Sequence, residues 1–428
     1  MNKVVFIDGC RTPFLKAGTD YQDLLSYQLA QFAIKGLIDK TQISNLKIDR
    51  VILGNVIANI KTSNVSREAA LMAGVDYKTP CNTVVQACIS ANRAICDAYF
   101  EIASGKGDII IAGGVDSCSD TPIGYKKSMQ KKLFNAQKIK GFWATIRFIF
   151  SFKISDFFPE RPQIAEYISG RTMGVDCDIM AAKWQISREE QDHFAVRSQQ
   201  LAYKAQQNKI LSEEIIPVSF PPEFKTIIHD NIVRSDTSYD AIKFLNPVFD
   251  KKFGTLTAAN SSQLTDGAAC VLLMNEKIAI AHDLNPMSFI VDFQFTGGDI
   301  SEELLLGPAY AVLQLLIRNK LKFSDIDVFE FHEAFAGQIL ANLKAISDAE
   351  FLKKIFNLNE SLGEIPIDKL NIHGGSLALG HPFGATGARL MTTASYRLKR
   401  EKGKYALIAA CAAGAHGHAM ILENYNSQ

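Results

Sequence analysis

A cysteine at the junction of two structural patterns is the first residue in this chain whose type and position suggest chemistry. Cys88 follows an apolar run that begins at Cys81, and apolar residues then recur at helical spacing from Ala94 to Ala103, with Gly105 as a stop. A thiol at such a strand-to-helix turn lies near the positive end of the helix dipole, which favours the thiolate. With a base nearby it would be a nucleophile, although a lone cysteine in this position is more often a buried core residue.

The last third of the chain contains three motifs that offer partners for this thiol. His332 lies at the end of a strand-like run, His381 stands between Gly380 and Pro382 in a glycine-dense turn, and Cys411 follows a further strand pattern. Glycines at this density indicate backbone packed tightly around a ligand. The turn therefore favours a function for His381, whereas His332 taken alone would be interpreted as structural.

The elements that must position these residues alternate short β-rich runs with helical patterns. In the first part, strand patterns lie at 4–7, 51–56, 81–87 and 108–115. Strands separated by helices predict parallel pairing through βαβ crossovers. The last third repeats this outline, since 326–331 echoes 48–53. The sequence therefore predicts a duplicated α/β unit whose equivalent loops meet at a pseudo-symmetric junction suited to a catalytic pocket.

Composition narrows the classes of protein to consider. The chain has 428 residues, 47% of them hydrophobic, and a net charge of +1, which predicts two or three ordinary globular domains and gives no reason to expect nucleic acid as a partner. The eight cysteines lack metal-ligand spacing and indicate reduced thiols in a reducing compartment. A strand pattern from Val4 leaves no room for a signal peptide, so we expect a cytoplasmic protein.

The stretch from Asp120 to Asp156 differs in character from the rest of the chain. Its cations, which no acid interrupts, are Lys126, Lys127, Lys131, Lys132, Lys138, Lys140, Arg147 and Lys153. Its latter part and the two residues just beyond it are rich in phenylalanine and contain Trp143. Such a segment can lie at an anionic membrane surface, contact a partner protein or bind the phosphates of a ligand. It is equally consistent with a solvated basic face over a locally buried aromatic cluster.

Taken together, five motifs resemble, in this order, those of the thiolase family. They are Cys88 with its helix, the 257–267 segment, the 332–335 run, the turn around His381 and the turn around Cys411. The match covers nearly the whole chain. The residues at 87–92 and the basic-aromatic insertion resemble those of one branch of the family. That branch is the β-chain of the trifunctional fatty acid oxidation complex and its bacterial counterpart.

The resemblance implies a five-layered α/β/α/β/α fold of two duplicated halves with an inserted loop domain. We expect the N-terminal half to comprise 1–121 and 250–283, the loop domain with its basic-aromatic insertion to comprise 122–249, and the C-terminal half to comprise 284–428. It also implies a 3-ketoacyl-CoA thiolase, an acetyl-CoA C-acyltransferase of fatty acid β-oxidation. Coenzyme A would be a substrate, and no cofactor or metal is expected.

The resemblance further implies a role for each chemical group. His381 would take the proton of Cys88, which would attack the 3-keto carbon and become acylated, and Cys411 would protonate the enolate of acetyl-CoA. One oxyanion site would use His381 and a water held by His332, and the other the backbone N–H groups of Cys88 and Ala413. Many thiolases have Asn where this chain has His332, and Ala412 to Ala415 replaces a glycine-rich turn.

Further expectations concern the ligands and partners. By the same matching, Ser262 would contact the pantetheine arm of CoA and Met173 would lie beside the acyl chain. The branch implies a homo-oligomer, a hydratase/dehydrogenase α-chain as partner and peripheral membrane contact through 121–158. The alternatives are a short-chain acetyl-CoA acetyltransferase and a ketoacyl-synthase-like condensing enzyme. The latter family pairs its cysteine with two histidines, so Cys411 argues against it.

Overall fold

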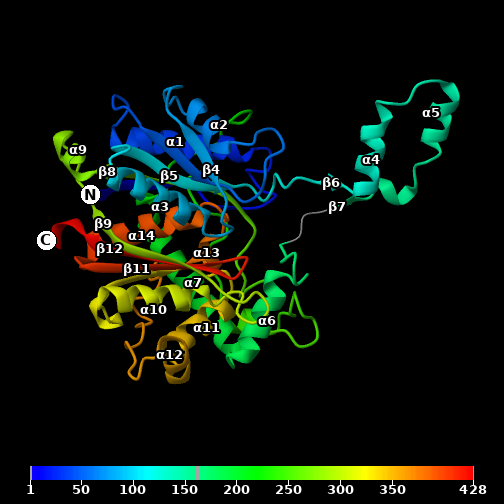
Figure 1. The fold of residues 1–428 in the computed structure, drawn as a ribbon. Helices are drawn as coiled ribbons and strands as arrows, with labels where there is room; N and C mark the ends of the chain where they lie inside the picture. The colour runs from blue at the N-terminus through cyan, green and yellow to red at the C-terminus, as the bar shows by residue number, and fades with distance from the viewer. Residues whose placement is uncertain (1, 161–163, 428) are drawn as a thin grey trace.

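Two halves of one large sheet form the centre of the molecule in the computed structural model, which describes residues 2–160 and 164–427 (Figure 1). The strand order is β10-β11-β12-β9-β1-β8-β5-β3-β4, and β9 meets β1 at Val5–Phe289 and Phe6–Ser288. The N-terminal half contains β1 (Val4–Arg11), β3 (Arg50–Gly54), β4 (Cys81–Val84), β5 (Ile109–Asp116) and β8 (Thr265–Asn275), which also pairs with β2 (Leu15–Lys16). The C-terminal half contains β9 (Ser288–Gly297), β10 (Val328–Phe331), β11 (Tyr405–Ala412) and β12 (His416–Asn424).

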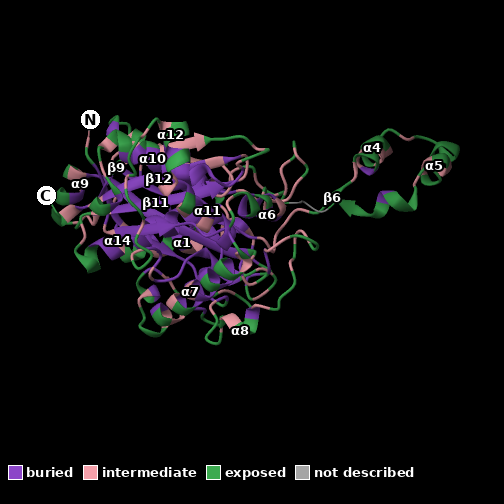
Figure 2. Ribbon diagram, turned by 90° about the horizontal axis from the view of Figure 1, so that it is seen from below, coloured by how far each residue is buried: buried purple, intermediate pink, exposed green. Residues whose placement is uncertain are grey.

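Helices cover both faces of each half and give the predicted five layers. Two helices, α3 (Ser90–Ala103) and α14 (Thr386–Glu401), contact strands of the N-terminal half, and α14 also contacts β10 and β11. Outside the N-terminal half lie α1 (Ser26–Thr41) and α2 (Val65–Met72), and outside the C-terminal half lie α10 (Gly307–Asn319) and α11 (Ala336–Ser347). Three apolar clusters fill the spaces between the layers: one lies on the outer face of each half, and the third surrounds α3 and α14 between the halves. The buried residues follow the layers in Figure 2. Burial of these apolar faces is what holds the layers together.

The expectation of parallel pairing was correct for part of the sheet and wrong for the rest. β3 pairs in parallel with β4 and β5, as the βαβ pattern predicts. β8 instead lies antiparallel between β1 and β5. It enters the sheet only after the long loop segment, so no short right-handed crossover constrains its direction.

Part of the segment that is inserted into the N-terminal half, before β8, is helical and is anchored by buried charge. The amphipathic spacing over 179–208 predicts a helical region with a capped start at Ser187. The structure has α6 (Met173–Lys183) and α7 (Arg188–Gln207) here, and Ser187 and Glu190 form a capping box at the start of α7. Buried Arg11 of β1 binds Glu214 at 2.7 Å and Asp230 at 2.6 Å, which fixes this segment to the N-terminal half. The other helices are α8 (Tyr239–Ile242), α9 (Glu276–Ala281), α12 (Ala349–Phe356) and α13 (Ser376–Leu379).

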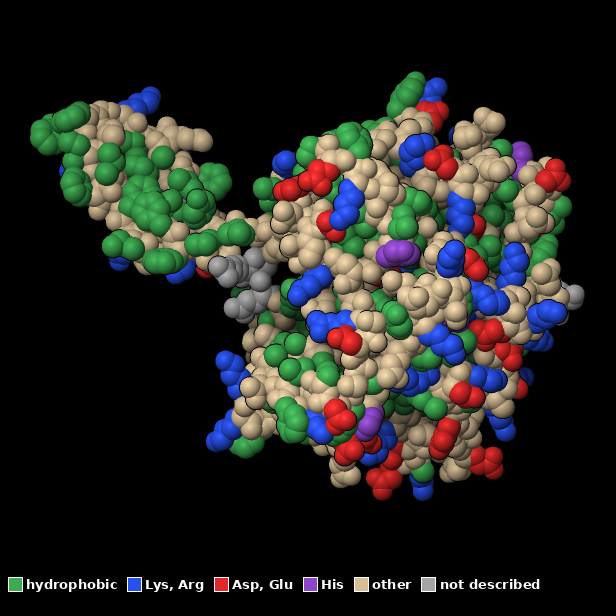
Figure 3. Space-filling view, turned by 180° about the vertical axis from the view of Figure 1, so that it is seen from behind, with side chains coloured by type: hydrophobic (Ala, Val, Ile, Leu, Met, Phe, Trp, Pro, Cys, Tyr) green, Lys and Arg blue, Asp and Glu red, His purple; other side chains and the backbone are tan. Residues whose placement is uncertain are grey.

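The basic-aromatic stretch forms an arm that projects from the body (Figures 1 and 3). Its stem is the pair of short strands β6 (Gly124–Tyr125) and β7 (Pro159–Glu160), and its tip contains α4 (Lys127–Ala136), α5 (Phe142–Ile149) and the short helix η1 (Ile154–Phe157). The arm folds on itself around Asp156, which accepts hydrogen bonds from Ser128 at 2.8 Å and Lys132 at 2.6 Å. Within the described ranges, no helix is both long and apolar enough to cross a membrane.

Candidate active site

The turn that carries Cys88 is held in an unusual backbone conformation. β4 ends at Val84 and α3 begins at Ser90, as the strand-to-helix pattern predicts. Between them Ala87 has φ of +46°, a left-handed conformation that is costly for a residue with a Cβ atom. The Ser90 hydroxyl clamps the turn, because it accepts from the Gln86 N–H at 2.8 Å and donates to the Ala87 carbonyl at 2.7 Å. The result is a sharp bend that presents the side chain of Cys88.

The environment of Cys88 favours the neutral thiol. Burial raises the pKa of Cys88 to about 12, and the nearby Asp116 carboxylate acts in the same direction. Hydrogen bonds from the backbone N–H groups of Ala413 and of Cys88 itself oppose this increase in pKa. The sequence-based expectation of a stabilised thiolate was therefore wrong, because desolvation outweighs the helix end. The two N–H groups predicted to form an oxyanion site do lie at the sulfur.

The two histidines lie face to face in the buried interior. The rings of His332 and His381 are tilted at 42°, with their centres 4.0 Å apart. His381 Nδ1 lies 2.6 Å from the Thr386 hydroxyl, and His332 Nδ1 lies 2.8 Å from the Ser376 hydroxyl. Burial and the charge of Arg389 lower the pKa of His381 to about 3, so its imidazole is neutral and can accept a proton.

Cys411 completes the group from the end of β11. The strand β11 lies beside β10, and the N–H of His332 donates to the carbonyl of Ala409 at 2.8 Å. Burial raises the pKa of Cys411 well above its ordinary value, and the electrostatic interaction with Cys88 raises it further. The second cysteine is therefore also a neutral thiol that interacts with the first. In chemical terms it is a proton donor.

A cavity of about 470 Å³ opens onto Cys88. Its apolar wall includes Met173, the residue that the sequence analysis expects beside an acyl chain, together with Ile57, Leu264 and Phe383. The last two connect the cavity to the base, since Leu264 bridges to His381 and the Phe383 ring lies 5.1 Å from the imidazole. A space of this size and lining suits an elongated apolar chain attached to a polar group.

Ser262 lines neither this cavity nor a second one at the neighbouring residue Gln263. Its N–H donates to the Ala334 carbonyl at 3.0 Å. The neighbouring residue Gln263 lines a second cavity of about 430 Å³, whose wall also includes Lys16 and Arg234. The segment 257–267 therefore passes from a polar site with two cations to an apolar site with a thiol.

Several residues that organise the site were not predicted from the sequence. They are Ser376, Arg389, Thr386 and Asp116. Thr386, the first residue of α14, lies only five residues beyond His381, so its nearness in the chain is a local signal for this contact. The others contact their partners across long separations in the chain, for which the sequence contains no local signal. Within residues 2–160 and 164–427, no group of three or more His, Cys, Asp or Glu side chains could hold a metal ion.

The fold and this set of residues define a class of protein, and comparisons with known proteins show the family. The N-terminal domain of thiolase matches residues 4–277, and the C-terminal domain of thiolase matches residues 284–424. The chain belongs to the thiolase family and is an acyltransferase.

Relatives resemble the chain over its whole length. The mitochondrial trifunctional enzyme subunit beta of Bos taurus is 47% identical over 99% of this chain and 89% of its own length. A probable 3-ketoacyl-CoA thiolase of Caenorhabditis elegans is 44% identical over 99% of this chain and 95% of its own. Among solved structures, human mitochondrial 3-ketoacyl-CoA thiolase superimposes with a TM-score of 0.84 at 28% identity, covering 99% of both chains.

Proposed function

We propose that the chain is a 3-ketoacyl-CoA thiolase of fatty acid β-oxidation, which uses CoA to cleave 3-ketoacyl-CoA into acetyl-CoA and a shortened acyl-CoA. The observation that carries this proposal is a pair of neutral thiols, of which Cys88 opens onto the apolar cavity, together with a neutral imidazole that is linked to the wall of that cavity through Leu264 and Phe383. A thiol nucleophile, a base and a separate carbon acid are the three groups that this reaction requires. The similarity to 3-ketoacyl-CoA thiolases along the full chain supports the substrate class.

In the first half-reaction, Cys88 Sγ attacks the 3-keto carbon as its proton passes to His381. The bond between carbons 2 and 3 then breaks, which leaves the shortened acyl group on Cys88 as a thioester. The electron pair of that bond forms the enolate of acetyl-CoA, and Cys411 delivers a proton to its carbon. Because burial keeps both thiols protonated at rest, the proton transfers occur during the reaction rather than before it.

In the second half-reaction, a CoA thiol replaces acetyl-CoA and attacks the thioester on Cys88. Its proton passes to the Cys411 thiolate, acyl-CoA leaves, and His381 returns its proton to Cys88, so that all three groups are restored. We assign the N–H groups of Cys88 and Ala413 as donors to the oxyanion of the thioester. We assign His332 and His381 as donors to the other oxyanion. One such donor contributes about 3–4 kcal/mol to transition-state stabilisation.

We assign the second cavity to the CoA portion of the substrate, with Ser262 beside the pantetheine arm. Lys16 and Arg234 would supply positive charge for phosphate groups, and Met173 in the first cavity would contact the acyl chain. In this proposal CoA is a substrate, and the reaction uses no resident cofactor or metal.

A turnover assay with 3-ketoacyl-CoA and CoA tests the function and separates it from its alternatives. We expect thiolysis with acyl chains long enough to fill the apolar cavity, whereas a short-chain acetyl-CoA acetyltransferase would be limited to acetoacetyl-CoA. A ketoacyl-synthase-like enzyme would condense acyl groups without needing Cys411. The paired histidines His332 and His381 resemble that class, but the second thiol does not, and Cys411→Ser would leave such an enzyme active. Absence of thiolysis at every chain length would contradict the proposal.

The projecting arm supports a further part of the proposal, which concerns location and partners. We infer that the chain acts with a hydratase/dehydrogenase α-chain, as the trifunctional relatives suggest, and associates as copies of itself. We assign the arm to an anionic membrane surface. Its large apolar side chains are exposed rather than buried, contrary to the interpretation as a covered aromatic cluster: Phe134, Phe142, Trp143, Phe150, Ile154, Phe157 and Phe158 are all more than half exposed. Figure 3 shows them gathered on the arm.

The arm can be tested with charge-reversal variants that leave its fold intact. Lys131, Lys138 and Lys140 are exposed, whereas Lys132 must remain because it binds Asp156. Changing the first three to Glu should abolish flotation with anionic liposomes, since each cation contributes about 1 kcal/mol near such a surface. Lys320, Lys353 and Lys354, exposed on the body, provide a matched triple variant that should still float. Unchanged flotation of the arm variant, or loss of α-chain pull-down alone, would contradict the membrane assignment.

A further inference from the structure

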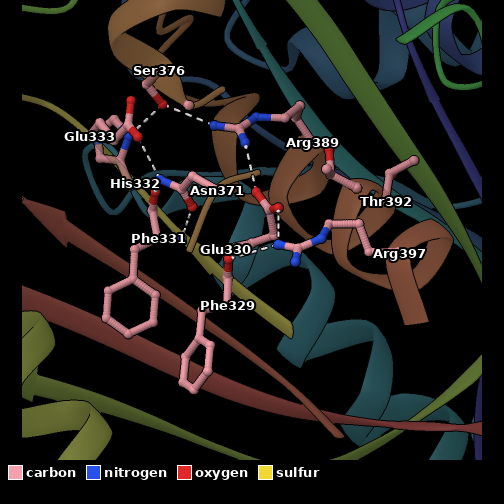
Figure 4. Close-up of polar contacts among 12 residues, drawn as sticks. Phe329, Glu330, Phe331, His332, Glu333, Asn371, Ser376, Arg389, Thr392 and Arg397 are labelled. Carbon is pink, nitrogen blue, oxygen red and sulfur yellow. Dashed lines mark hydrogen bonds and ion pairs between the residues drawn. The ribbon is translucent and has the colours of Figure 1, made fainter. Parts of the chain in front are cut away.

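Two side chains outside the set of reacting residues form a chain of hydrogen bonds that ends at His332. His332 Nδ1 lies 2.8 Å from the Ser376 hydroxyl, which in turn lies 2.9 Å from the guanidinium of Arg389 (Figure 4). The other ring nitrogen of His332, Nε2, is buried and has no hydrogen-bond partner within the described part of the chain. The same is true of His381 Nε2. These two nitrogens are therefore free to meet a substrate.

The hydrogen positions around Ser376 follow from the donors present. A guanidinium can only donate, so Arg389 gives a hydrogen to the Ser376 oxygen. The single hydroxyl hydrogen of Ser376 then has His332 Nδ1 as its acceptor. A neutral imidazole that accepts at Nδ1 carries its hydrogen on Nε2. His332 is thus a donor at the nitrogen that lacks a partner.

The neighbouring imidazole is held in the opposite tautomer. The Thr386 hydroxyl donates to the Pro382 carbonyl at 3.1 Å, one turn back along the chain. It must then accept from His381 Nδ1, 2.6 Å away, which leaves His381 Nε2 with a lone pair. Two rings 4.0 Å apart therefore present one acceptor and one donor.

We propose that Ser376 and Arg389 are positioning residues that keep the proton of His332 on Nε2, so that His332 donates to a substrate oxygen while His381 accepts the proton of Cys88. This inference rests on the proposed thiolase function. The device is needed because histidine offers an N–H at that nitrogen in only one tautomer, whereas the amide of an asparagine always offers one. A histidine at this position therefore depends on its neighbours in a way that an asparagine does not.

Buried charge fixes Arg389 in place. Glu330 lies on β10, two residues before His332, which directly follows the strand. Its carboxylate lies 3.6 Å from Arg389 and 2.9 Å from Arg397, and all three side chains are buried (Figure 4). The positive charge of Arg389 also lowers the pKa of His332, in addition to the effects of burial and of His381, and so keeps the ring neutral. A neutral ring and an oriented hydroxyl together specify one tautomer.

The resting enzyme provides the first test, which needs no substrate. Proton-coupled ¹⁵N spectra of the ring-labelled holoenzyme should show His332 protonated at Nε2 and His381 protonated at Nδ1. His332→Asn identifies the signals of His332 by their loss. A spectrum with His332 protonated at Nδ1 would overturn the proposal. This result is independent of turnover, so it stays interpretable even if the chain shows no thiolysis and the proposed function fails.

A double-mutant cycle provides the second test. Ser376→Ala should lower kcat by up to about 10²-fold with little change in KM, because one donor in an oxyanion site is worth about 10²–10³-fold. Ser376→Thr should retain most activity. In the His332→Asn background, Ser376→Ala should change kcat by less than about two-fold, as expected for uncoupled sites.

Matched controls separate positioning from simple damage to the fold. The control variant is Ser395→Ala. It also removes a buried serine hydroxyl, which bonds to Ser288 at 2.9 Å away from the site, and it should leave kcat unchanged. An equal loss from Ser376→Ala in both backgrounds, or no loss in the parent, would refute the positioning role. If Ser376→Ala fails to fold, the ¹⁵N spectrum of the parent decides.

Discussion

Both thiols at the site are neutral in the resting protein, and this sets how the nucleophile can be generated. A preformed ion pair between Cys88 and His381 would require a thiol pKa below that of the imidazole. The structure has the reverse order, since burial raises the pKa of Cys88 to about 12 and lowers that of His381 to about 3. Proton transfer must therefore accompany attack on the substrate, when the developing oxyanion meets its donors.

This order of pKa values predicts how Cys88 responds to alkylation. Iodoacetamide reacts with the thiolate, whose fraction increases tenfold for each pH unit below the thiol pKa. The rate at Cys88 should therefore increase about tenfold per unit from about pH 6 to 9 without reaching a plateau, whereas an ordinary thiol levels off above its pKa of about 8.5. Peptide mass spectrometry on the Cys118→Ser background excludes the other thiol in the cavity. A rate independent of pH would show a thiolate–imidazolium pair instead.

The separate roles of Cys411 and His381 predict different losses in their variants. Cys411→Ser should abolish exchange of the α-protons of acetyl-CoA and leave Cys88 able to accept an acetyl group. His381→Ala should slow that acylation by about 10²–10⁴-fold, the usual value of a positioned base. Deuterium exchange and mass spectrometry of the Cys88 peptide measure the two steps. Exchange at the parent rate in Cys411→Ser would show that another group handles the carbon proton.

At the scale of elements, one buried carboxylate at the end of β5 joins two loops that surround the site. Asp116, the last residue of β5, accepts from Asn55 Nδ2 at 2.9 Å, from the N–H of Ile57 at 2.8 Å and from the N–H of Gly384 at 2.5 Å. Ile57 lines the cavity, and Gly384 follows the turn of His381. The position of the base relative to the cavity wall therefore depends on this carboxylate.

We expect Asp116→Asn to impair both stability and catalysis. An amide would face several N–H donors with one NH₂ group, and a buried group left unpaired costs about 1–3 kcal/mol. Urea unfolding at pH 8, above the pKa of about 7 that burial gives Asp116, should show this loss together with a reduced kcat. Asp327→Asn is the control, because Asp327 accepts from the N–H groups of Lys404 and Tyr405 away from the site. Its kcat should remain at the parent value, and an unchanged kcat in Asp116→Asn would exclude the proposed link.

The limits of prediction from the sequence follow from the range of each interaction. The turn at Cys88, the start of α7 and the turn of His381 are encoded by neighbouring residues, and their patterns were visible. The antiparallel pairing of β1 with β8 and β9 and the raised pKa of Cys88 depend on distant packing, whereas the sequence predicts parallel pairing and a thiolate. The contact of Ser376 with His332 joins residues 44 apart in the chain, so no local pattern indicates it.

At the scale of the molecule, the body and the arm are built on different principles. The body buries three apolar clusters between its layers and places the reacting groups where the two halves meet. The arm exposes its apolar side chains, and in the structure its short stem is the pair of strands β6 and β7. Its helices contribute no residue to the cavity at Cys88. Folding and chemistry should therefore be separable from whatever the arm contacts.

Removal of the arm tests this separation directly. Gly124 and Glu160 are paired across the stem, so residues 125–159 can be replaced by Asn-Gly, which favours a tight turn between such strands. The shortened protein should unfold thermally within about 2–4 °C of the parent, a shift that corresponds to about 1 kcal/mol or less. Thiolysis of short-chain 3-ketoacyl-CoA should be unchanged, while flotation with anionic liposomes should disappear. A variant that folds but loses short-chain thiolysis would show that the arm also supports the active site, because its body and its reacting groups are otherwise intact.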